Sequence, residues 1–395
     1  MSYLAQAIER FLVSKALEKQ SATQSALLLS ELRERGLDKA FQQHYRKATT
    51  SLETKQTRDP NYFRERLRLE EALFQHSTRA GGRSTADILQ RVVHTMDTAY
   101  RTTRLKYSCE LLNRQNVLSD ETALPTADAF VASLKPAEIA SEPTLAAYYH
   151  IYHTLAEGPQ ETHFKQLKAV LQEHPTRFSD RELRDIYVFA QNFCIRQINM
   201  GHTQYLQELY DTYRVLLEKG LLLDSGTLAQ FHFKNIVTVA LRLGEYDWVE
   251  QFIAQNSRHV EQALRKNAEN YNLASLHFAR KAYGKARRLL LEVEFTDVYY
   301  HLDSKALLLK TYYELDEVEP LISLVATFRT YLRRNRKISD YQRKTYLNMV
   351  KFVLKLVRVK LGSRKPLAEI EAEMRAVKQI ADLTWLQAKT LELAT

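Results

Sequence analysis

The chain has few residues that interrupt helices. Only 10 glycines and 8 prolines occur among 395 residues, about 5% of the chain against roughly 12% in average proteins. Six of the eight prolines precede residue 180, so the second half contains almost no helix breakers. No segment alternates apolar and polar residues for long enough between turn signals to predict a strand. These absences predict an all-α fold.

Cysteines and long apolar runs are scarce or lacking as well. The two cysteines, Cys109 and Cys194, each lie in a helical apolar pattern, which excludes a disulfide framework and predicts buried free thiols. No run of about 18 apolar residues could span a bilayer, and the first twelve residues lack the apolar core of a signal peptide. We therefore expect a cytoplasmic protein without a transmembrane segment.

The motifs that carry common enzyme chemistry are absent too. The sequence has no Walker loop, glycine-rich dinucleotide turn, G-x-S-x-G elbow or H-E-x-x-H helix. His150 and His153 lie three residues apart on a predicted helix, but no third ligand follows at metal-site spacing. We therefore expect no catalytic residues, no cofactor and no metal, and a protein that is not an enzyme.

What the chain does contain is a helical hairpin that recurs three times. The copies begin near Phe233, Tyr271 and Ser304, and each has an apolar helix, a short turn and a second helix. Val249, Ala286 and Leu321 occupy matching positions that are 37 and 35 residues apart. A period of this size predicts stacked helix pairs that bury their apolar faces on neighbouring pairs.

Composition divides the chain into three parts. Residues 1–117 form a predicted N-terminal helical region. Nothing breaks a helix from Thr85 to Leu118, which predicts either one long helix or two helices with a tight joint near Asp97. Residues 118–142 contain Pro125 and Pro136 and predict a linker or irregular segment. Residues 143–395 then carry regularly spaced helices with short joints, which predict helical repeats.

The excess of positive charge lies at the C-terminal end. Residues 327–395 hold 16 basic and 6 acidic residues, whereas the rest of the chain has 41 of each. On the helix predicted after residue 339, four cations lie along one narrow stripe, namely Lys344, Lys351, Lys355 and Arg358. The bland interpretation is a solvated face on a largely enclosed helix, and the functional one is an anion-binding surface. The candidate basic surface comprises Arg333, Arg334, Arg336, Lys337, Lys344, Lys351, Lys355 and Arg358.

The three hairpins resemble the tetratricopeptide repeat (TPR). Ile236-Val237, Leu273-Ala274 and Leu308-Leu309 occupy the paired core positions, and Gly244, Tyr246, Tyr283 and Ala286 match the turn and the start of the second helix. Only Ala274 is small at the close-packing position, and the terminal proline of the family is absent. The resemblance implies a right-handed superhelix of antiparallel helix hairpins, a TPR-like α-solenoid.

In such a fold the first helix of each hairpin lines a groove. The resemblance implies that the partner-binding residues are Lys234, Arg242, Tyr271, Phe278, Lys310 and Tyr313, with Thr238 and Ser275 on the same faces. These residues favour a scaffold that binds a protein or peptide, either acidic or through a C-terminal carboxylate. The alternative is a nucleic-acid-binding protein that uses the C-terminal basic surface.

Overall fold

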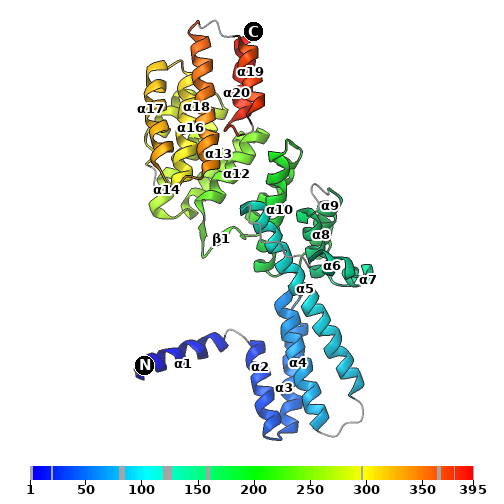
Figure 1. The fold of residues 1–395 in the computed structure, drawn as a ribbon. Helices are drawn as coiled ribbons and strands as arrows, with labels where there is room; N and C mark the ends of the chain where they lie inside the picture. Colours follow the sequence, from blue (N-terminus) through cyan, green and yellow to red (C-terminus); the bar gives the residue numbers. More distant parts are fainter. Residues whose placement is uncertain are drawn as a thin grey trace. The chain divides into compact units, whose positions relative to one another are not determined.

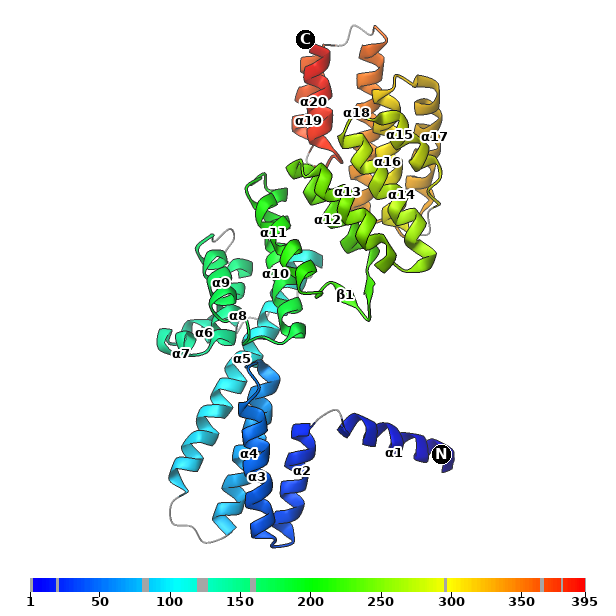
Figure 2. The same ribbon diagram turned by 180° about the vertical axis from the view of Figure 1, so that it is seen from behind.

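The computed structural model confirms an all-α fold (Figures 1 and 2). It describes residues 3–18, 21–79, 85–118, 127–156, 161–294, 297–362, 366–377 and 379–394. These ranges contain twenty α-helices, one 3-10 turn and one pair of two-residue strands.

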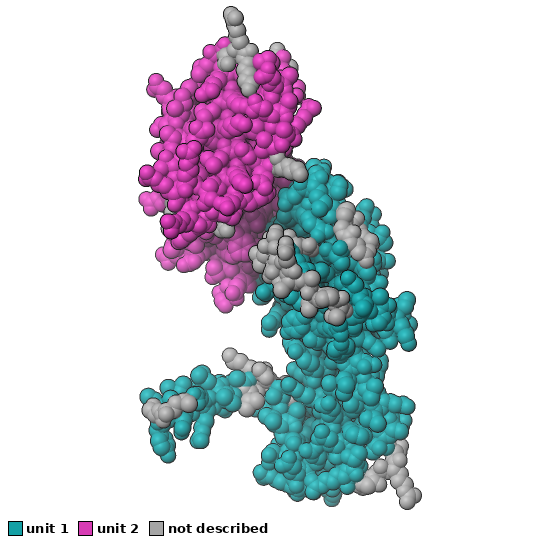
Figure 3. All heavy atoms as spheres, viewed as in Figure 1, with its two compact units in different colours: residues 1–221 teal, residues 222–395 magenta. Residues whose placement is uncertain are grey.

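The chain divides into two compact units (Figure 3), Met1–Leu221 and Leu222–Thr395. The linker or irregular segment predicted at residues 118–142 stays a prediction. Helices from both sides of that segment pack together in the first unit, because α5 (Ala86–Leu118) contacts α8 (Pro143–Ala156). Whether residues 1–117 form a domain of their own stays a prediction, and residues 119–126 lie outside the described ranges.

The first half of unit 1 is organised around α4 (Pro60–Arg79). This helix packs against α2 (Ser21–Glu34), α3 (Asp38–Glu53) and α5, and α1 (Tyr3–Glu18) contacts α2. Of the two alternatives left open for residues 85–118, the structure shows the single helix, α5, which is 33 residues long. The core between these helices consists of Leu29, Phe41, Leu52, Tyr62, Phe63, Leu69 and Ala99.

The second half of unit 1 continues from α5 to the end of α11. Its helices are α6 (Ala127–Ser133), α7 (Pro136–Ser141), α8, α9 (Glu161–Glu173), α10 (Asp180–Asn199) and α11 (Tyr205–Glu218). Helix α8 packs on α5, α9 and α10, and α10 packs on α11. Both cysteines are buried and free, as predicted. Burial raises the pKa of the Cys194 thiol to about 12, which keeps it protonated.

Unit 2 begins with a short strand pair that the sequence analysis did not predict. Strands β1 (Leu223–Asp224) and β2 (Thr227–Leu228) pair antiparallel around a two-residue turn. Ser225 and Gly226 both have a positive φ, 50° and 84°, as the tight hairpin turn requires. The first helix of unit 2 therefore begins only after this strand pair, and α12 spans Gln230–Leu243.

Helices α12 to α18 of unit 2 form two rows. Each helix from α12 to α17 contacts the next one along the chain. In addition, α12 contacts α14, α14 contacts α16, and α16 contacts α18. One row therefore holds α12, α14, α16 and α18, and the other holds α13, α15 and α17. The bounds are α13 (Tyr246–Asn256), η1 (Ser257–His259), α14 (Gln262–Ala279), α15 (Tyr283–Leu291), α16 (Val298–Glu314), α17 (Val318–Arg334), α18 (Asp340–Lys360), α19 (Leu367–Ala376) and α20 (Leu383–Ala394).

The same turn closes all three hairpins. Gly244, Lys281 and Asp316 follow α12, α14 and α16, and each has a left-handed backbone, with φ of 82°, 58° and 57°. The amide after each of them donates to the carbonyl five residues earlier, at distances of 2.8–3.0 Å, which is the Schellman end of a helix. These residues are 37 and 35 residues apart, which matches the sequence period.

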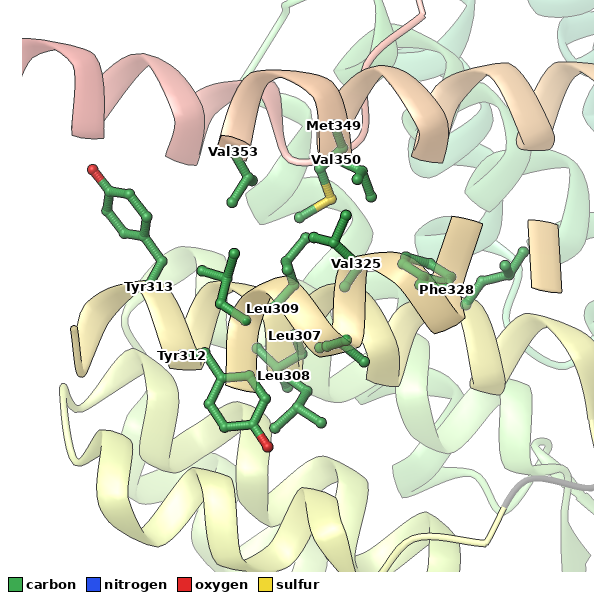
Figure 4. Packing of buried hydrophobic residues seen from close by; sticks show 14 of the residues in the cluster. Leu307, Leu308, Leu309, Tyr312, Tyr313, Val325, Phe328, Met349, Val350 and Val353 are labelled. Carbon is green, nitrogen blue, oxygen red and sulfur yellow. The ribbon is translucent and has the colours of Figure 1, made fainter. Parts of the chain in front are cut away.

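The core of unit 2 lies between the two rows of helices. Figure 4 shows side chains of α16, α17 and α18 meeting there, with Tyr312 and Tyr313 pointing to different sides of α16. Phe328, Leu309 and Met349 are almost fully buried. Ala286, which occupies in the second hairpin the position that Val249 and Leu321 occupy in the other two, is also fully buried.

Candidate ligand groove and basic surface

A groove of about 560 Å³ lies along the first-helix row of unit 2. Helices α12, α14 and α16 supply most of its lining, with Tyr346 of α18 and the residues before α20 at one end. The structure brings together here seven residues that the sequence analysis placed on groove faces: Lys234, Thr238, Arg242, Tyr271, Ser275, Phe278 and Lys310.

Helical spacing arranges the lining in two tiers. Lys234 and Arg242 on α12 are eight residues apart, and Tyr271 and Phe278 on α14 are seven apart. Seven or eight residues are about two helical turns, or roughly 11–12 Å. Contacts between helices show which residues lie at the same level, because Lys234 meets Asp303 and Lys310 meets Phe278. We call one level, with Lys234, Tyr271 and Asp303, the inner tier, and the other, with Arg242, Phe278 and Lys310, the outer tier.

The inner tier is held by a carboxylate that the sequence analysis missed. Asp303 accepts hydrogen bonds from Lys234 Nζ at 2.5 Å and from the Tyr346 hydroxyl at 2.5 Å. Burial and the charge of Asp303 raise the pKa of Tyr346, so its hydroxyl remains a donor. The ammonium group of Lys234 therefore already has a carboxylate partner within the protein. Asp303 lies seven residues before Lys310 on one face of α16, so helical periodicity could have identified it.

In the outer tier, Lys310 has a carboxylate partner and Arg242 has none among the described residues. Lys310 Nζ lies 2.8 Å from Oδ1 of Asp382 and 5.3 Å from the ring centroid of Phe278. Arg242 is exposed at the end of α12, and no carboxylate among the described residues lies within ion-pair distance of it. A ligand carboxylate can thus reach the Arg242 guanidinium without first breaking a contact.

Tyr313 does not line the groove, contrary to the expectation from the sequence. It is buried, and its ring meets that of Trp385 edge-on with centroids 5.3 Å apart. Trp385 Nε1 also donates to Glu314 at 2.8 Å, so α20 covers this end of α16. Burial raises the pKa of Tyr313 to about 12. No helix was predicted from the sequence at the position of α20 (Leu383–Ala394).

Four cations of the basic surface are exposed at the turn between α17 and α18. They are Arg333, Arg334, Arg336 and Lys337. The guanidinium of Arg343 donates to the backbone carbonyls of Leu332 at 2.9 Å, Ile338 at 3.1 Å and Asn335 at 3.3 Å. This side chain satisfies carbonyls that the end of α17 would otherwise leave open, and it fixes the turn that carries the four cations.

The stripe on α18 is less exposed than the sequence predicted. Lys344, Lys351 and Arg358 are exposed, but Lys351 and Lys355 both form ion pairs with Glu373 of α19. The side chain of Lys355 is only 19% exposed. Helix α19 therefore covers part of the stripe and neutralises part of its charge.

A cluster of imidazoles lies between α8 and α9. The Nδ1 atoms of His150 and His163 are 2.9 Å apart, and the His153 ring stacks on His163 with centroids 4.4 Å apart. Burial and the neighbouring imidazoles lower the pKa of His150 to about 4. His163 was not foreseen because it comes from a different helix. Even so, the described ranges contain no group of three or more His, Cys, Asp or Glu arranged to hold a metal ion.

None of the helices in the described part of the chain combines the length and apolar character that crossing a bilayer requires. No protein-family model matches the chain, and no curated protein is significantly similar to it.

Proposed function

We propose that this protein is a non-enzymatic scaffold, a TPR-like α-solenoid that binds a protein or peptide in the groove of unit 2. The repeated left-handed turns after α12, α14 and α16 support a repeat architecture. Stacked hairpins of this kind build concave surfaces suited to extended ligands. The right-handed superhelix is part of the same proposal.

The observation that carries the proposal is the convergence of seven predicted residues on one groove. Its chemistry suits an acidic peptide or a C-terminal carboxylate. Arg242 offers a planar guanidinium that binds a carboxylate through two parallel hydrogen bonds. Phe278 offers an aromatic surface beside it for an apolar side chain, with Lys310 on the far side. Charged and apolar contacts are thus available in one extended path.

Reversing the charge of Arg242 is expected to weaken ligand binding strongly. We would select peptides from a displayed random library on the full-length chain and measure their Kd by fluorescence anisotropy. A hydrogen bond to a charged group contributes about 1.5–3 kcal/mol, so Arg242→Glu should raise Kd by roughly tenfold to a hundredfold.

Arg288→Glu is the matched control. Arg288 is an exposed cation on α15, in the other row of helices, and it does not line the groove. This variant should bind the selected peptides within about twofold of the unmodified chain. Equal weakening by both variants, or a library that yields no binder, would remove the support for a peptide-binding groove.

The alternative function is nucleic-acid binding by the basic surface. The observation that favours it is the fixed turn with four exposed cations, since cations arranged on a rigid element can follow a phosphate backbone. The pairing of Lys351 and Lys355 with Glu373 weakens it.

Filter binding with RNA and DNA distinguishes the two functions. We expect no complex tighter than the ~10⁻⁴–10⁻⁶ M of non-specific contacts at physiological salt. The variant with Arg333, Arg334 and Arg336 changed to Glu serves as the reference for such contacts. If the unmodified chain binds more tightly, with an affinity that falls steeply with salt and disappears in this variant, nucleic-acid binding replaces the scaffold function.

A further inference from the structure

The residues just before α20 line one end of the groove. Its backbone is tied to α18, since Asn348 Nδ2 donates to the carbonyl of Gln379 at 2.8 Å and the Ala381 amide donates to the carbonyl of Thr345 at 3.2 Å. These contacts place Ala381 and Asp382 in the lining of the groove. A part of the chain far from the three hairpins thus contributes a carboxylate to the outer tier.

Asp382 is held there in an unusual conformation. Its φ is +52°, a left-handed backbone that costs energy for most residues and that aspartate and asparagine tolerate best. Its carboxylate meets Lys310, whose side chain is 12% exposed, while that of Asp382 is 36% exposed. The carboxylate therefore lies at the solvent side of the pair.

The two lysines of the groove differ in how firmly they are occupied. The partner of Lys234 is Asp303, which accepts from two donors. The described residues offer Asp382 only the one side-chain donor, Lys310. An incoming carboxylate can therefore replace Asp382 with the loss of a single, partly exposed ion pair.

We propose that Asp382 is a built-in competitor of the groove's ligand. Its carboxylate occupies the position at Lys310 that an acidic group of the ligand takes, and ligand binding exchanges one carboxylate for the other. This inference rests on the proposed peptide-binding function and adds to it a device that lowers affinity for acidic ligands. Partly exposed ion pairs are weak, so the competition costs between about 1.5-fold and fivefold in affinity.

The probe is chosen to span the outer tier. Helices α12 and α16 are separated by α14, and neighbouring helix axes lie about 8–10 Å apart. The backbones that carry Arg242 and Lys310 are therefore roughly 16–20 Å apart, although side chains of α12 and α16 can meet in the groove, as Lys234 and Asp303 do. A peptide of about six extended residues is long enough to reach both cations. We would use a fluorescein-labelled peptide of that length with a glutamate at each end and a leucine in the middle. A second peptide has glutamines in place of the glutamates.

The experiment measures Kd for both peptides with the full-length chain and two variants. Asp382→Asn removes the competing charge and keeps a residue that tolerates the left-handed backbone. Asp316→Asn is the matched control, because Asp316 also has a positive φ, 57°, and forms an ion pair with a lysine, Lys360, outside the groove. We expect Asp382→Asn to lower Kd of the glutamate peptide by about 1.5-fold to fivefold and to leave the glutamine peptide unchanged. Asp316→Asn should have no effect on either.

A second background separates direct competition from general electrostatics. With Lys310→Met already present, Asp382→Asn should no longer change Kd, because the contested position has been removed. Equal tightening by Asp316→Asn, tightening that persists without Lys310, or a glutamate peptide that Asp382→Asn does not bind more tightly would each overturn the inference. If library-selected peptides still depend on Arg242 in that case, the peptide-binding function stands and the competition alone is wrong.

Discussion

Replacing Phe328 by alanine is expected to lower the free energy of unfolding by about 3–5 kcal/mol. Phe328 is 1% exposed and lies on α17 at the junction with α16 and α18 (Figure 4). Its ring meets that of Tyr346 with centroids 6.0 Å apart. Removal of the ring leaves a cavity that close-packed neighbours fill only in part.

Tryptophan fluorescence during urea unfolding is a suitable measurement. Both tryptophans, Trp248 and Trp385, belong to unit 2, so the signal follows the unit that contains the substitution. Ile322→Ala on the same helix is the control, because Ile322 is 52% exposed and its loss should change stability by no more than about 0.5 kcal/mol. A similar loss for both variants would contradict the assigned packing of α17.

The second large effect is expected in unit 1, at a carboxylate that is almost fully buried. Glu182 is 4% exposed and forms an ion pair with Lys106 at 2.9 Å, and the Tyr148 hydroxyl donates to it. Lys106 also contacts Asp185 at 2.8 Å. Lys106→Met leaves the charge of Glu182 without its cation, so we expect a loss of about 2–4 kcal/mol, below the full cost of breaking a buried pair because Lys106 is partly exposed.

Hydrogen exchange along α5 and α10 measures this effect locally, because Lys106 and Glu182 belong to these two helices. Adding Glu182→Gln to Lys106→Met should restore part of the lost protection, since a neutral amide needs no counter-charge. Arg114→Met on α5 is the control, as Arg114 and Glu110 form an exposed pair that contributes little. Equal protection in all variants would mean that the ion pair does not stabilise unit 1.

The faces of the first helices could be predicted because they follow from local periodicity. In a helix, residues three, four and seven apart share a face, so an apolar pattern that marks the buried side also marks the opposite, open side. Lys234, Tyr271 and Phe278 were assigned to a groove because the hairpins resemble the tetratricopeptide repeat, and all three line the groove of unit 2. The same reasoning misplaced Tyr313, because the face it predicted to be open is covered by another helix.

The turns show where local information ends. Gly244 is the residue type that a left-handed helix end favours, and the sequence indicated a turn there. Lys281 and Asp316 adopt the same conformation, although neither side chain favours it as glycine does. Packing of the second helix on the first stabilises these turns enough to offset the local strain, and such packing is a property of the assembled hairpin.

The sequence by itself therefore determined the helical class and the hairpin period, because each depends on residues close together in the chain. Tertiary structure decided which charged side chains of the groove and of α18 have an ion-pair partner and which have none. Asp382 meets Lys310 and Glu373 meets Lys355 across 72 and 18 residues, and both acids come from the segment after α18, which packs against α16 and α18. The energy of a charge depends on its neighbours in space, so Arg242 became the open cation of the groove only when the chain was folded.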